Sequence, residues 1–397
     1  MTIAPHDEMQ KILEQNARRL FAENSSRSEL EEVDRDDGIP RALYLRMAEL
    51  DWFRLLIPSE RGGAGARMVD MLSLLGEVGR SRIPGPILDS AVGAVWMITR
   101  ARGSNADEWL VRIGAAEWLT SLVLVDEDER WGPDILPVTA LRSSSGYSLN
   151  GTLGYIESAD KSDRWLVAAQ MEGRPAKASL FLVDPAAQGV TVSRQSGLGV
   201  LRPFVVRLSE VLLAQSDVLG ELGAAWPLVE EGVAVCALAR SAVGLGAAQR
   251  TMEIAVDYAR NRQQFGRPIG DYQSMQYQCT AMLSDVQALR SITFRAAEAF
   301  DNNDPNRSQL ASVAKAWSND ACLRVARRAH RVMGAVGFAA EHELHHFTEM
   351  AEAGRANWGT SRFHRNRLSD AIDPIQPALR AERVLDQTDD VMSSGSR

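Results

Sequence analysis

The segment Tyr258-Ala-Arg-Asn-Arg-Gln-Gln-Phe-Gly-Arg-Pro-Ile-Gly-Asp-Tyr-Gln273 decides how the second half of this chain folds. Apolar residues recur at three- and four-residue spacing over 225–261 before the turn and over 271–302 after it. The residues between the two patterns do not keep that period. We therefore expect a tight turn that joins two long helices.

The turn carries side chains that suit a phosphate-bearing ligand. Arg262 can make forked, charge-assisted contacts with a phosphate, Phe265 offers an aromatic face, and Gly266 lets the backbone approach closely. The simpler alternative is an ordinary helix C-terminus, at which Arg260 and Arg262 oppose the helix dipole and Gly266 is the cap. From the residues alone, both interpretations stay open.

Periodicity divides the rest of the chain into three parts. Residues 7–117 have helical patterns, whereas short β-rich runs separated by Gly, Pro, Asp and Ser follow from Trp118 to Leu219. We expect a small all-β domain there, with a loop-rich α/β insert as the alternative. Helical periods return after residue 221, over 225–261, 271–302, 306–335 and, less regularly, 361–384, and predict a four-helix bundle. The predicted units are residues 1–117, 118–220, 221–384 and a flexible tail over 385–397.

Composition excludes several classes of function. The 397 residues are 45% hydrophobic and 24% charged, with 44 basic and 52 acidic side chains and no basic block, so we expect no nucleic-acid surface. No apolar run approaches the length of a membrane span, and the N-terminus lacks the pattern of a secretion signal. Three scattered cysteines give no metal spacing and fit a reducing, cytoplasmic setting.

Several runs resemble the acyl-CoA dehydrogenase family. The turn matches that family's R-x-x-F-G-x-P-I-x-x-x-Q pattern, and Leu50–Gly63 and Glu77-Val-Gly-Arg80 resemble two of its N-terminal runs. The resemblance implies an α+β multidomain fold: an N-terminal all-α domain, a middle β-barrel or sandwich domain, and a C-terminal four-helix bundle.

The resemblance also implies a site for FAD that two subunits share. In the family, this turn and a Q-x-x-G-G element clamp the ADP half of an FAD held by the neighbouring subunit. The clamp residues implied here are Arg262, Phe265, Gln273, Arg331 and Gly334. Gln has become Arg331, and the second glycine has become Ala335. The alternative for Gly334 and Gly337 is close helix packing.

The flavin-ring half departs from the family pattern. Val125–Asp134, where the family has T-E-P-x-x-G-S-D, is rich in carboxylates that would repel a phosphate. Asn150–Ser158 keeps the Asn-Gly turn, but Glu157 replaces a hydroxyl residue that meets the ring. A glutamate is a poor partner for a ring that becomes anionic when reduced.

The family's proton acceptor is missing as well. The loop that usually carries its glutamate is Asn357-Trp-Gly-Thr-Ser361, so Trp358 occupies that position, and indole can only donate a hydrogen bond. The second position that the family uses is Cys236. We interpret Glu230 and Glu231 as solvated or interface charges, not as a relocated base. The histidines at 342, 345, 346 and 364 predict a polar interface surface and no metal site.

Together these observations predict a subunit of an FAD-dependent acyl-CoA dehydrogenase that is inactive alone. A paralogous catalytic subunit in an α2β2 tetramer would supply the base and bind most of the acyl-CoA, and FAD would be shared with it. By resemblance, the substrate is a bulky acyl-CoA such as a steroid side-chain thioester in lipid degradation, and electron-transferring flavoprotein takes the electrons. Two alternatives stay open: a self-sufficient homotetrameric flavoenzyme with a displaced base, such as Glu157 or Glu231, and a flavin-free structural member.

Overall fold

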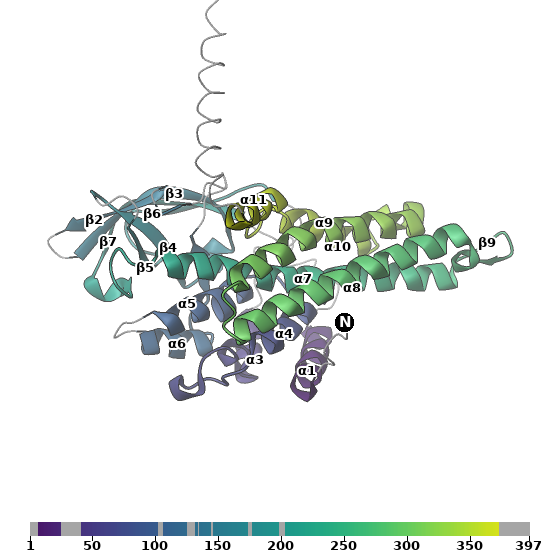
Figure 1. Ribbon diagram of the computed structural model, residues 1–397, viewed down its shortest axis with the longest axis horizontal. Coiled ribbons are helices and arrows are strands. Elements are labelled where there is room, and N and C mark those ends of the chain that lie inside the picture. The colour runs from purple at the N-terminus through teal and green to yellow at the C-terminus, as the bar shows by residue number, and fades with distance from the viewer. Residues whose placement is uncertain are drawn as a thin grey trace, which may run out of the picture.

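The computed structural model describes residues 7–24, 41–101, 106–124, 132–133, 135–143, 146–173, 177–197 and 203–372. Within these residues a helical N-terminal part, a sheet and a long helical C-terminal part follow one another along the chain (Figure 1). The first part contains α1 (Glu8–Asn24), α3 (Arg41–Glu49), α4 (Met68–Arg80), η3 (Leu88–Ala94, π-helical), α5 (Val95–Arg100) and α6 (Ala106–Gly114), with short turns η1 (Trp52–Arg54) and η2 (Ser59–Arg61).

The middle part is one eight-stranded sheet with strand order β6-β7-β3-β2-β4-β5-β8, in which β1 pairs with β4 in parallel. A register shift in β3 lies between Leu153 and Ile156, and Tyr155 within it has a φ of 59°. The strands are β1 (Thr120–Val123), β2 (Val138–Ser143), β3 (Gly146–Glu157), β4 (Arg164–Met171), β5 (Ala178–Val183), β6 (Val190–Arg194), β7 (Pro203–Leu213) and β8 (Val218–Leu219). Short helical turns η4 (Ala159–Lys161) and η5 (Gln215–Asp217) complete this part.

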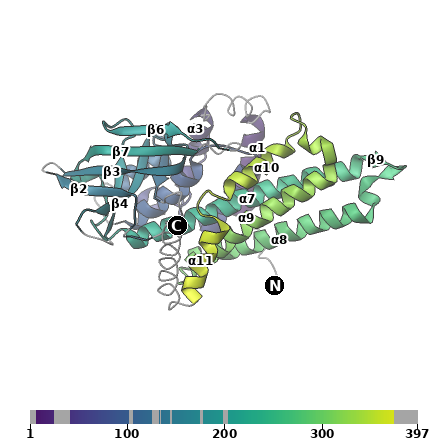
Figure 2. The same ribbon diagram turned by 90° about the horizontal axis from the view of Figure 1, so that it is seen from above.

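The C-terminal part is built on three long helices: α7 (Trp226–Asn261), α8 (Gln273–Asp301) and α9 (Arg307–Met333). The predicted turn between α7 and α8 is a hairpin of β9 (Gln263–Gln264) and β10 (Arg267–Pro268), followed by η6 (Ile269–Asp271). The hairpin projects at the end of the helices that is far from the sheet (Figures 1 and 2).

Two shorter helices complete this part of the fold. Helix α10 (Leu344–Gly354) follows η7 (Gly334–Phe338) and was not predicted from the sequence. It buries Leu344, Phe347 and Met350 against the bundle. The helix predicted over 361–384 is described as α11 (Ser361–Ile372), and the rest of that range and the tail lie outside the described residues. No described helix has the length and apolar character to cross a membrane.

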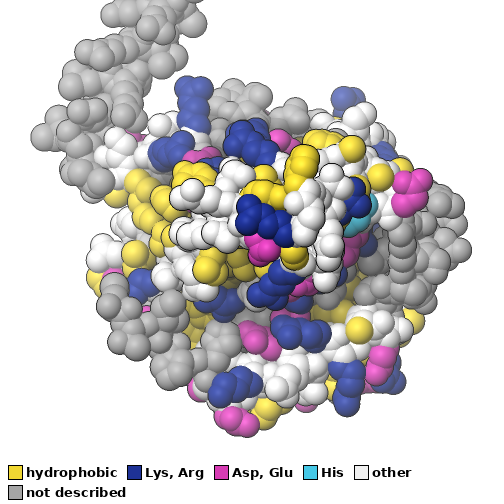
Figure 3. Space-filling view, turned by 90° about the vertical axis from the view of Figure 1, so that its right-hand side faces the viewer, with side chains coloured by type: hydrophobic (Ala, Val, Ile, Leu, Met, Phe, Trp, Pro, Cys, Tyr) yellow, Lys and Arg dark blue, Asp and Glu magenta, His cyan; other side chains and the backbone are white. Residues whose placement is uncertain are grey.

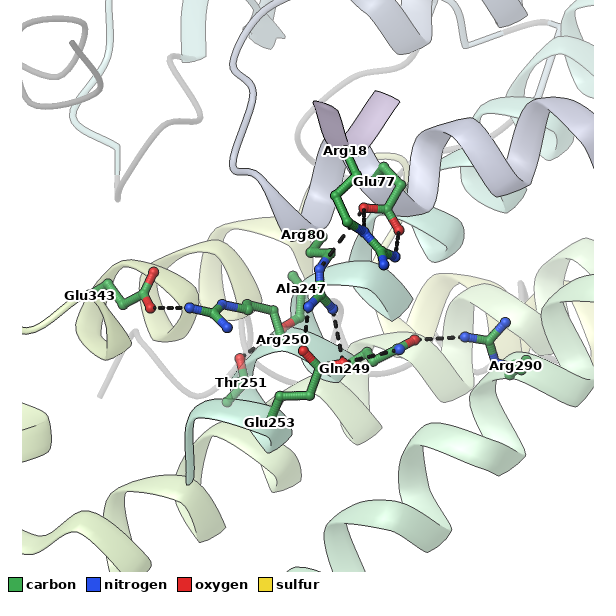
Figure 4. Close-up of polar contacts among 10 residues, drawn as sticks. All are labelled: Arg18, Glu77, Arg80, Ala247, Gln249, Arg250, Thr251, Glu253, Arg290 and Glu343. Atoms are coloured by element: carbon green, nitrogen blue, oxygen red, sulfur yellow. Dashed lines mark hydrogen bonds and ion pairs between the residues drawn. The ribbon is translucent and has the colours of Figure 1, made fainter. Parts of the chain in front are cut away.

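The N-terminal helices lie against the bundle across a close crossing of α4 and α7. Gly246 on α7 lies so near α4 that an added Cβ would be 1.7 Å from the Gly76 carbonyl oxygen. Beside this crossing, Glu77 accepts a hydrogen bond of 2.6 Å from Arg18 on α1, and Arg80 donates one of 2.9 Å to Glu253 on α7 (Figure 4). Glu77 and Arg80, which the sequence analysis noted, therefore join three helices.

Candidate functional site

A cavity of about 120 Å³ lies where the end of β3, η3 and α7 meet the loop before α11. This is the place to which the resemblance assigns both the flavin ring and the catalytic base. The lining residues are Asp89, Leu122, Gly154, Tyr155, Ile156, Glu157, Val233, Ala356, Asn357, Trp358, Gly359, Thr360 and Phe363.

Trp358 is held against a buried carboxyl group. It has a φ of 58°, an uncommon conformation for a bulky residue, and its indole N–H lies close enough to Asp89 to lower the pKa of that carboxyl group. Asp89 is 4% exposed, and its Oδ2 accepts a hydrogen bond of 3.1 Å from the Leu122 amide. Burial, and then the nearby Glu157, raise the pKa of Asp89 well above its usual value.

A second carboxyl group, that of Glu157, lines the same cavity. Burial raises its pKa, and the guanidinium of Arg240 on α7 partly offsets that rise. Arg240 is itself 9% exposed, and its charge also lowers the pKa of Asp89. The cavity therefore holds two carboxyl groups whose pKa values burial raises, with one buried cation nearby.

Cys236 lies one turn before Arg240 on α7 and is fully buried. An added Cβ at Gly93 would be 2.5 Å from its sulfur, so the thiol fills the space between α7 and η3. Burial, and then Asp89, raise the pKa of this thiol well above its usual value. A neutral thiol and an indole thus occupy the two positions to which the resemblance assigns the catalytic base, and neither accepts a proton at neutral pH.

Helices α9 and α11 fix the loop that carries Trp358. Since a carbonyl can only accept, His364 donates from Nε2 to the Trp358 oxygen at 2.9 Å, while its Nδ1 accepts from the Ser312 hydroxyl at 3.1 Å. Burial, and then Lys315, lower the pKa of His364 to about 3. Lys315 Nζ donates to the Gly359 oxygen at 3.1 Å. His364 therefore does not belong to the predicted polar surface; it is a neutral support of this loop.

The cavity does not fit a flavin ring. Sites for ligands of drug size have volumes of about 300–1,000 Å³, and this one has about 120 Å³. The Trp358 side chain and two carboxyl groups line the remaining space. We derive no chemical step through a flavin at this position.

A larger pocket of about 800 Å³ opens beside the first turns of α7 and α9. It shares no lining residue with the cavity at Trp358. On its wall, Glu231 accepts a hydrogen bond of 2.6 Å from Arg307 and lies 3.8 Å from Arg100. Burial lowers the pKa of Arg100 to about 10, which Glu231 opposes. Glu231 is therefore part of an ion pair within the chain, and its carboxylate is already engaged.

The hairpin between α7 and α8 presents its aromatic tip to solvent. Phe265 and Gly266 have φ values of 54° and 82°, which suits the two central positions of a type I′ turn. Phe265 is 91% exposed, and its ring meets Tyr272 edge to face. Arg262 and Gln273, on either side of the hairpin, are also exposed.

The second predicted segment lies at the same end of the bundle, because α9 runs back toward the hairpin (Figures 1 and 2). Arg331 and Gly334 are exposed there, and Gly334 has a φ of 60° with open space around its Cα. Gly337, in contrast, packs closely: an added Cβ would be 2.9 Å from Leu344. Close packing, the alternative explanation for these two glycines, therefore accounts for Gly337 but not for Gly334.

This end face combines exposed basic and aromatic groups. Phe338 is 70% exposed, and basic side chains lie beside hydrophobic ones over the end of the molecule (Figure 3). Cations and aromatic faces are the groups that hold a diphosphate and an adenine ring. The residues at this face are of the kinds that fit the ADP half of FAD, for which Arg262 and Arg331 would be the phosphate donors.

Other predicted site features have simpler outcomes. Most of Val125–Asp134 lies outside the described residues. Among the residues that are described, no group of three His, Cys, Asp or Glu side chains has the geometry of a metal site. Sequence patterns alone did not indicate Asp89, Arg240 or Lys315 as site residues, although Asp89 is the single acidic residue in the apolar run 86–98.

The comparisons with known proteins agree on the family. Residues 7–115 match the family model "Acyl-CoA dehydrogenase, N-terminal domain", and residues 224–372 match "Acyl-CoA dehydrogenase, C-terminal domain". An acyl-CoA dehydrogenase of Bacillus subtilis (strain 168) is 24% identical over 376 residues, which cover 91% of this chain and 97% of that protein.

Solved structures share the fold. The ChsE4-ChsE5 complex from Mycobacterium tuberculosis contains a chain with a TM-score of 0.84 and 23% identity, covering 94% of this chain and 99% of that one. A variant of the Tcur3481-Tcur3483 steroid ACAD gives a TM-score of 0.81 and 24% identity, with coverages of 92% and 98%. The chain is a member of the acyl-CoA dehydrogenase family.

Proposed function

We propose that this chain is the non-catalytic subunit of a heteromeric, FAD-dependent acyl-CoA dehydrogenase. It supplies the ADP-clamping face, with Arg262, Phe265, Gln273, Arg331 and Gly334, to an FAD whose ring lies in a paralogous catalytic subunit. The assembly is an α2β2 tetramer with one FAD for each heterodimer. Acting alone, the chain is inactive.

One observation supports this proposal above all others, namely the contrast between the two halves of the cofactor site. The small cavity at Trp358 is lined by its indole, by Asp89 and by the carboxyl of Glu157. The end face with Phe265 and Arg331 is exposed, basic and aromatic. A chain that bound its own flavin would need the first half, and one that serves a neighbour needs only the second.

The residues at the two family positions for the proton acceptor support the same assignment. Removal of a proton next to a thioester carbonyl needs a carboxylate within hydrogen-bond reach of the substrate. Trp358 and the neutral thiol of Cys236 cannot do this, and Glu231 is paired with Arg307. The partner therefore supplies the base and binds most of the acyl-CoA.

The remaining parts of the proposal come from relatives of this fold. One solved relative is named as a complex of ChsE4 with ChsE5, and another is titled a steroid ACAD. By this likeness we assign the substrate to bulky acyl-CoA thioesters such as steroid side chains. Electron-transferring flavoprotein is the proposed acceptor, and the cytoplasm the proposed location.

Co-expression with the paralogous chain tests the proposal directly. Flavin absorbance per chain and α,β-dehydrogenation are measured for the chain alone and for the complex. We expect both only in the complex, and Arg262→Ala should remove most of the flavin. Arg46→Ala, which changes an exposed arginine on α3, is the matched control and should leave the flavin content unchanged. A full complement of FAD and activity in the chain alone would contradict the proposal.

A self-sufficient flavoenzyme is the second candidate, and Glu157 is the observation that favours it. A carboxyl with a raised pKa on the wall of a cavity is typical of a catalytic base. In that case Glu157→Gln would abolish turnover by the purified chain. A complex that assembles without flavin would instead support a structural member of the family.

A further inference from the structure

A buried histidine lies directly beneath the turn that carries Gly334. His330, in the last turn of α9, is 9% exposed. Its ring stacks on Phe338, with the two ring centroids 4.2 Å apart and 22° between the planes. The turn η7, from Gly334 to Phe338, therefore rests on this imidazole.

The hydrogen bonds around His330 determine its tautomer. Nε2 lies 2.8 Å from the Thr348 hydroxyl oxygen, and that hydroxyl donates its own hydrogen to the Leu344 carbonyl at 3.3 Å. The Thr348 oxygen must then accept a hydrogen bond from His330, so the proton is on Nε2. Nδ1 carries the lone pair, and it is buried with no hydrogen-bond partner among the described residues.

A second proton on this ring would have no acceptor. Gly337 covers Nδ1 so closely that an added Cβ would be 3.0 Å from this nitrogen. Protonation would thus place a charged N–H against the backbone of η7, away from water. A buried charged donor without a partner is strongly unfavourable, and the turn would have to move to relieve it.

The charged groups around His330 do not compensate for that proton. Burial, then His345 and His342 from the α10 side, lower the pKa of His330. On α9 itself the neighbouring cations are Arg327 and Arg331. The nearby carboxylate of Glu343 is already paired with Arg250 of α7 at 2.7 Å. Only the C-terminal dipole of α9 favours a cation here.

We propose that His330 is a positioning residue for the FAD clamp: its neutral ring holds η7 in the shape that binds the ADP half, and acidification releases the cofactor. This inference rests on the proposed function, because it concerns the same clamp. It assigns to this chain a pH dependence of cofactor retention.

The size of the effect follows from proton linkage. The FAD-bound state excludes the proton from His330, whereas a displaced turn lets the ring titrate near the ordinary histidine value of about 6.5. The dissociation constant for FAD should then rise about tenfold between pH 7.5 and pH 5.5.

The first test measures FAD retention by the co-purified complex at both pH values, from the fluorescence of released flavin. We expect about a tenfold change for the wild type and less than twofold for His330→Gln, whose amide can still donate to Thr348 but does not titrate. His346→Gln is the matched control, because His346 lies beside His345 and Glu349 and not under η7. It should keep the wild-type response. An equal response in His330→Gln would overturn the inference.

The second test needs neither the partner nor a variant. The Ala339 amide bonds the Val336 carbonyl at 3.2 Å and reports on η7. Its hydrogen-exchange protection, corrected for the intrinsic rate, should fall in the wild-type chain between pH 7.5 and 5.5. Unchanged protection would overturn the inference even where the clamp proposal stands. If Arg262→Ala left flavin retention unchanged, the clamp proposal itself would be overturned.

Discussion

At the scale of single residues, Trp358 and Asp89 form one unit. A buried carboxyl normally needs a donor; the Leu122 amide donates to Asp89, and the indole N–H nearby also lowers the pKa of this carboxyl. The position is therefore adapted to an aromatic donor, and placing an acid there does not by itself restore a dehydrogenase.

Trp358→Glu should give no activity and should destabilise the fold. The change removes the indole N–H beside Asp89, opens a void and adds another carboxyl beside Asp89 and Glu157. We expect a loss of about 2–4 kcal/mol in unfolding free energy, measured by urea denaturation. Trp317→Glu, at a partly exposed tryptophan on α9, should cost much less. Dehydrogenation by the Trp358→Glu chain alone would contradict this account.

Glu157→Gln should stabilise the chain more at pH 8 than at pH 5. The folded-state pKa of Glu157 is raised, so the folded state favours the neutral acid, and its stability falls as pH rises through that pKa. Glutamine removes this titration. Each unit by which the pKa is raised corresponds to about 1.4 kcal/mol. Urea unfolding at pH 8 and pH 5 measures this difference in stabilisation. Glu172→Gln, at an exposed glutamate, is the control. A stabilisation by Glu157→Gln that is equal at both pH values would contradict the raised pKa of Glu157.

At the scale of elements, the hairpin shows a conflict between local preference and exposure. Type I′ turns favour Asn-Gly, yet Phe265 occupies the first position with a positive φ and is 91% exposed. Neither stability nor packing explains this residue, whereas the proposed contact with the cofactor would.

Phe265→Asn should therefore separate stability from function. We expect the unfolding free energy of the chain to stay within about 0.5 kcal/mol or to rise. Flavin retention by the complex should fall, because the aromatic face for the adenine side is lost. Thermal unfolding and flavin absorbance measure the two effects. Retention equal to wild type would remove Phe265 from the clamp.

The elements also show what the sequence can and cannot predict. The helices flanking the hairpin were predicted at 225–261 and 271–302 and are observed at Trp226–Asn261 and Gln273–Asp301, because their apolar period is long. Helix α10 was missed, because its four buried apolar residues, one of them only an alanine, are too few to outweigh two histidines and two glutamates.

The same limit applies to the site. A motif locates Trp358, but the partner of a side chain comes from another part of the chain. Asp89 is 269 positions away in sequence (358 minus 89), and no local pattern links the two. Arg240 and Lys315 look like ordinary helix surface residues until the bundle buries them.

At the scale of the whole molecule, the crossing of α4 and α7 joins the N-terminal helices to the bundle. Gly246→Ala should destabilise the chain by about 1–3 kcal/mol, since the new methyl would overlap the Gly76 carbonyl. Gly76→Ala is the matched control. Its added Cβ would have no neighbour within 4 Å, so it should raise stability by about 0.5–1 kcal/mol. Equal effects of the two changes, measured by urea denaturation, would contradict this packing.

The central claim is that this chain clamps a flavin whose ring belongs to another subunit. Its most direct measurement is the number of FAD molecules per chain, from flavin absorbance and protein mass of the purified complex. The account predicts one FAD for each pair of unlike chains and none for the chain alone. One FAD per copy of this chain, bound in a homomer that oxidises an acyl-CoA, would contradict it.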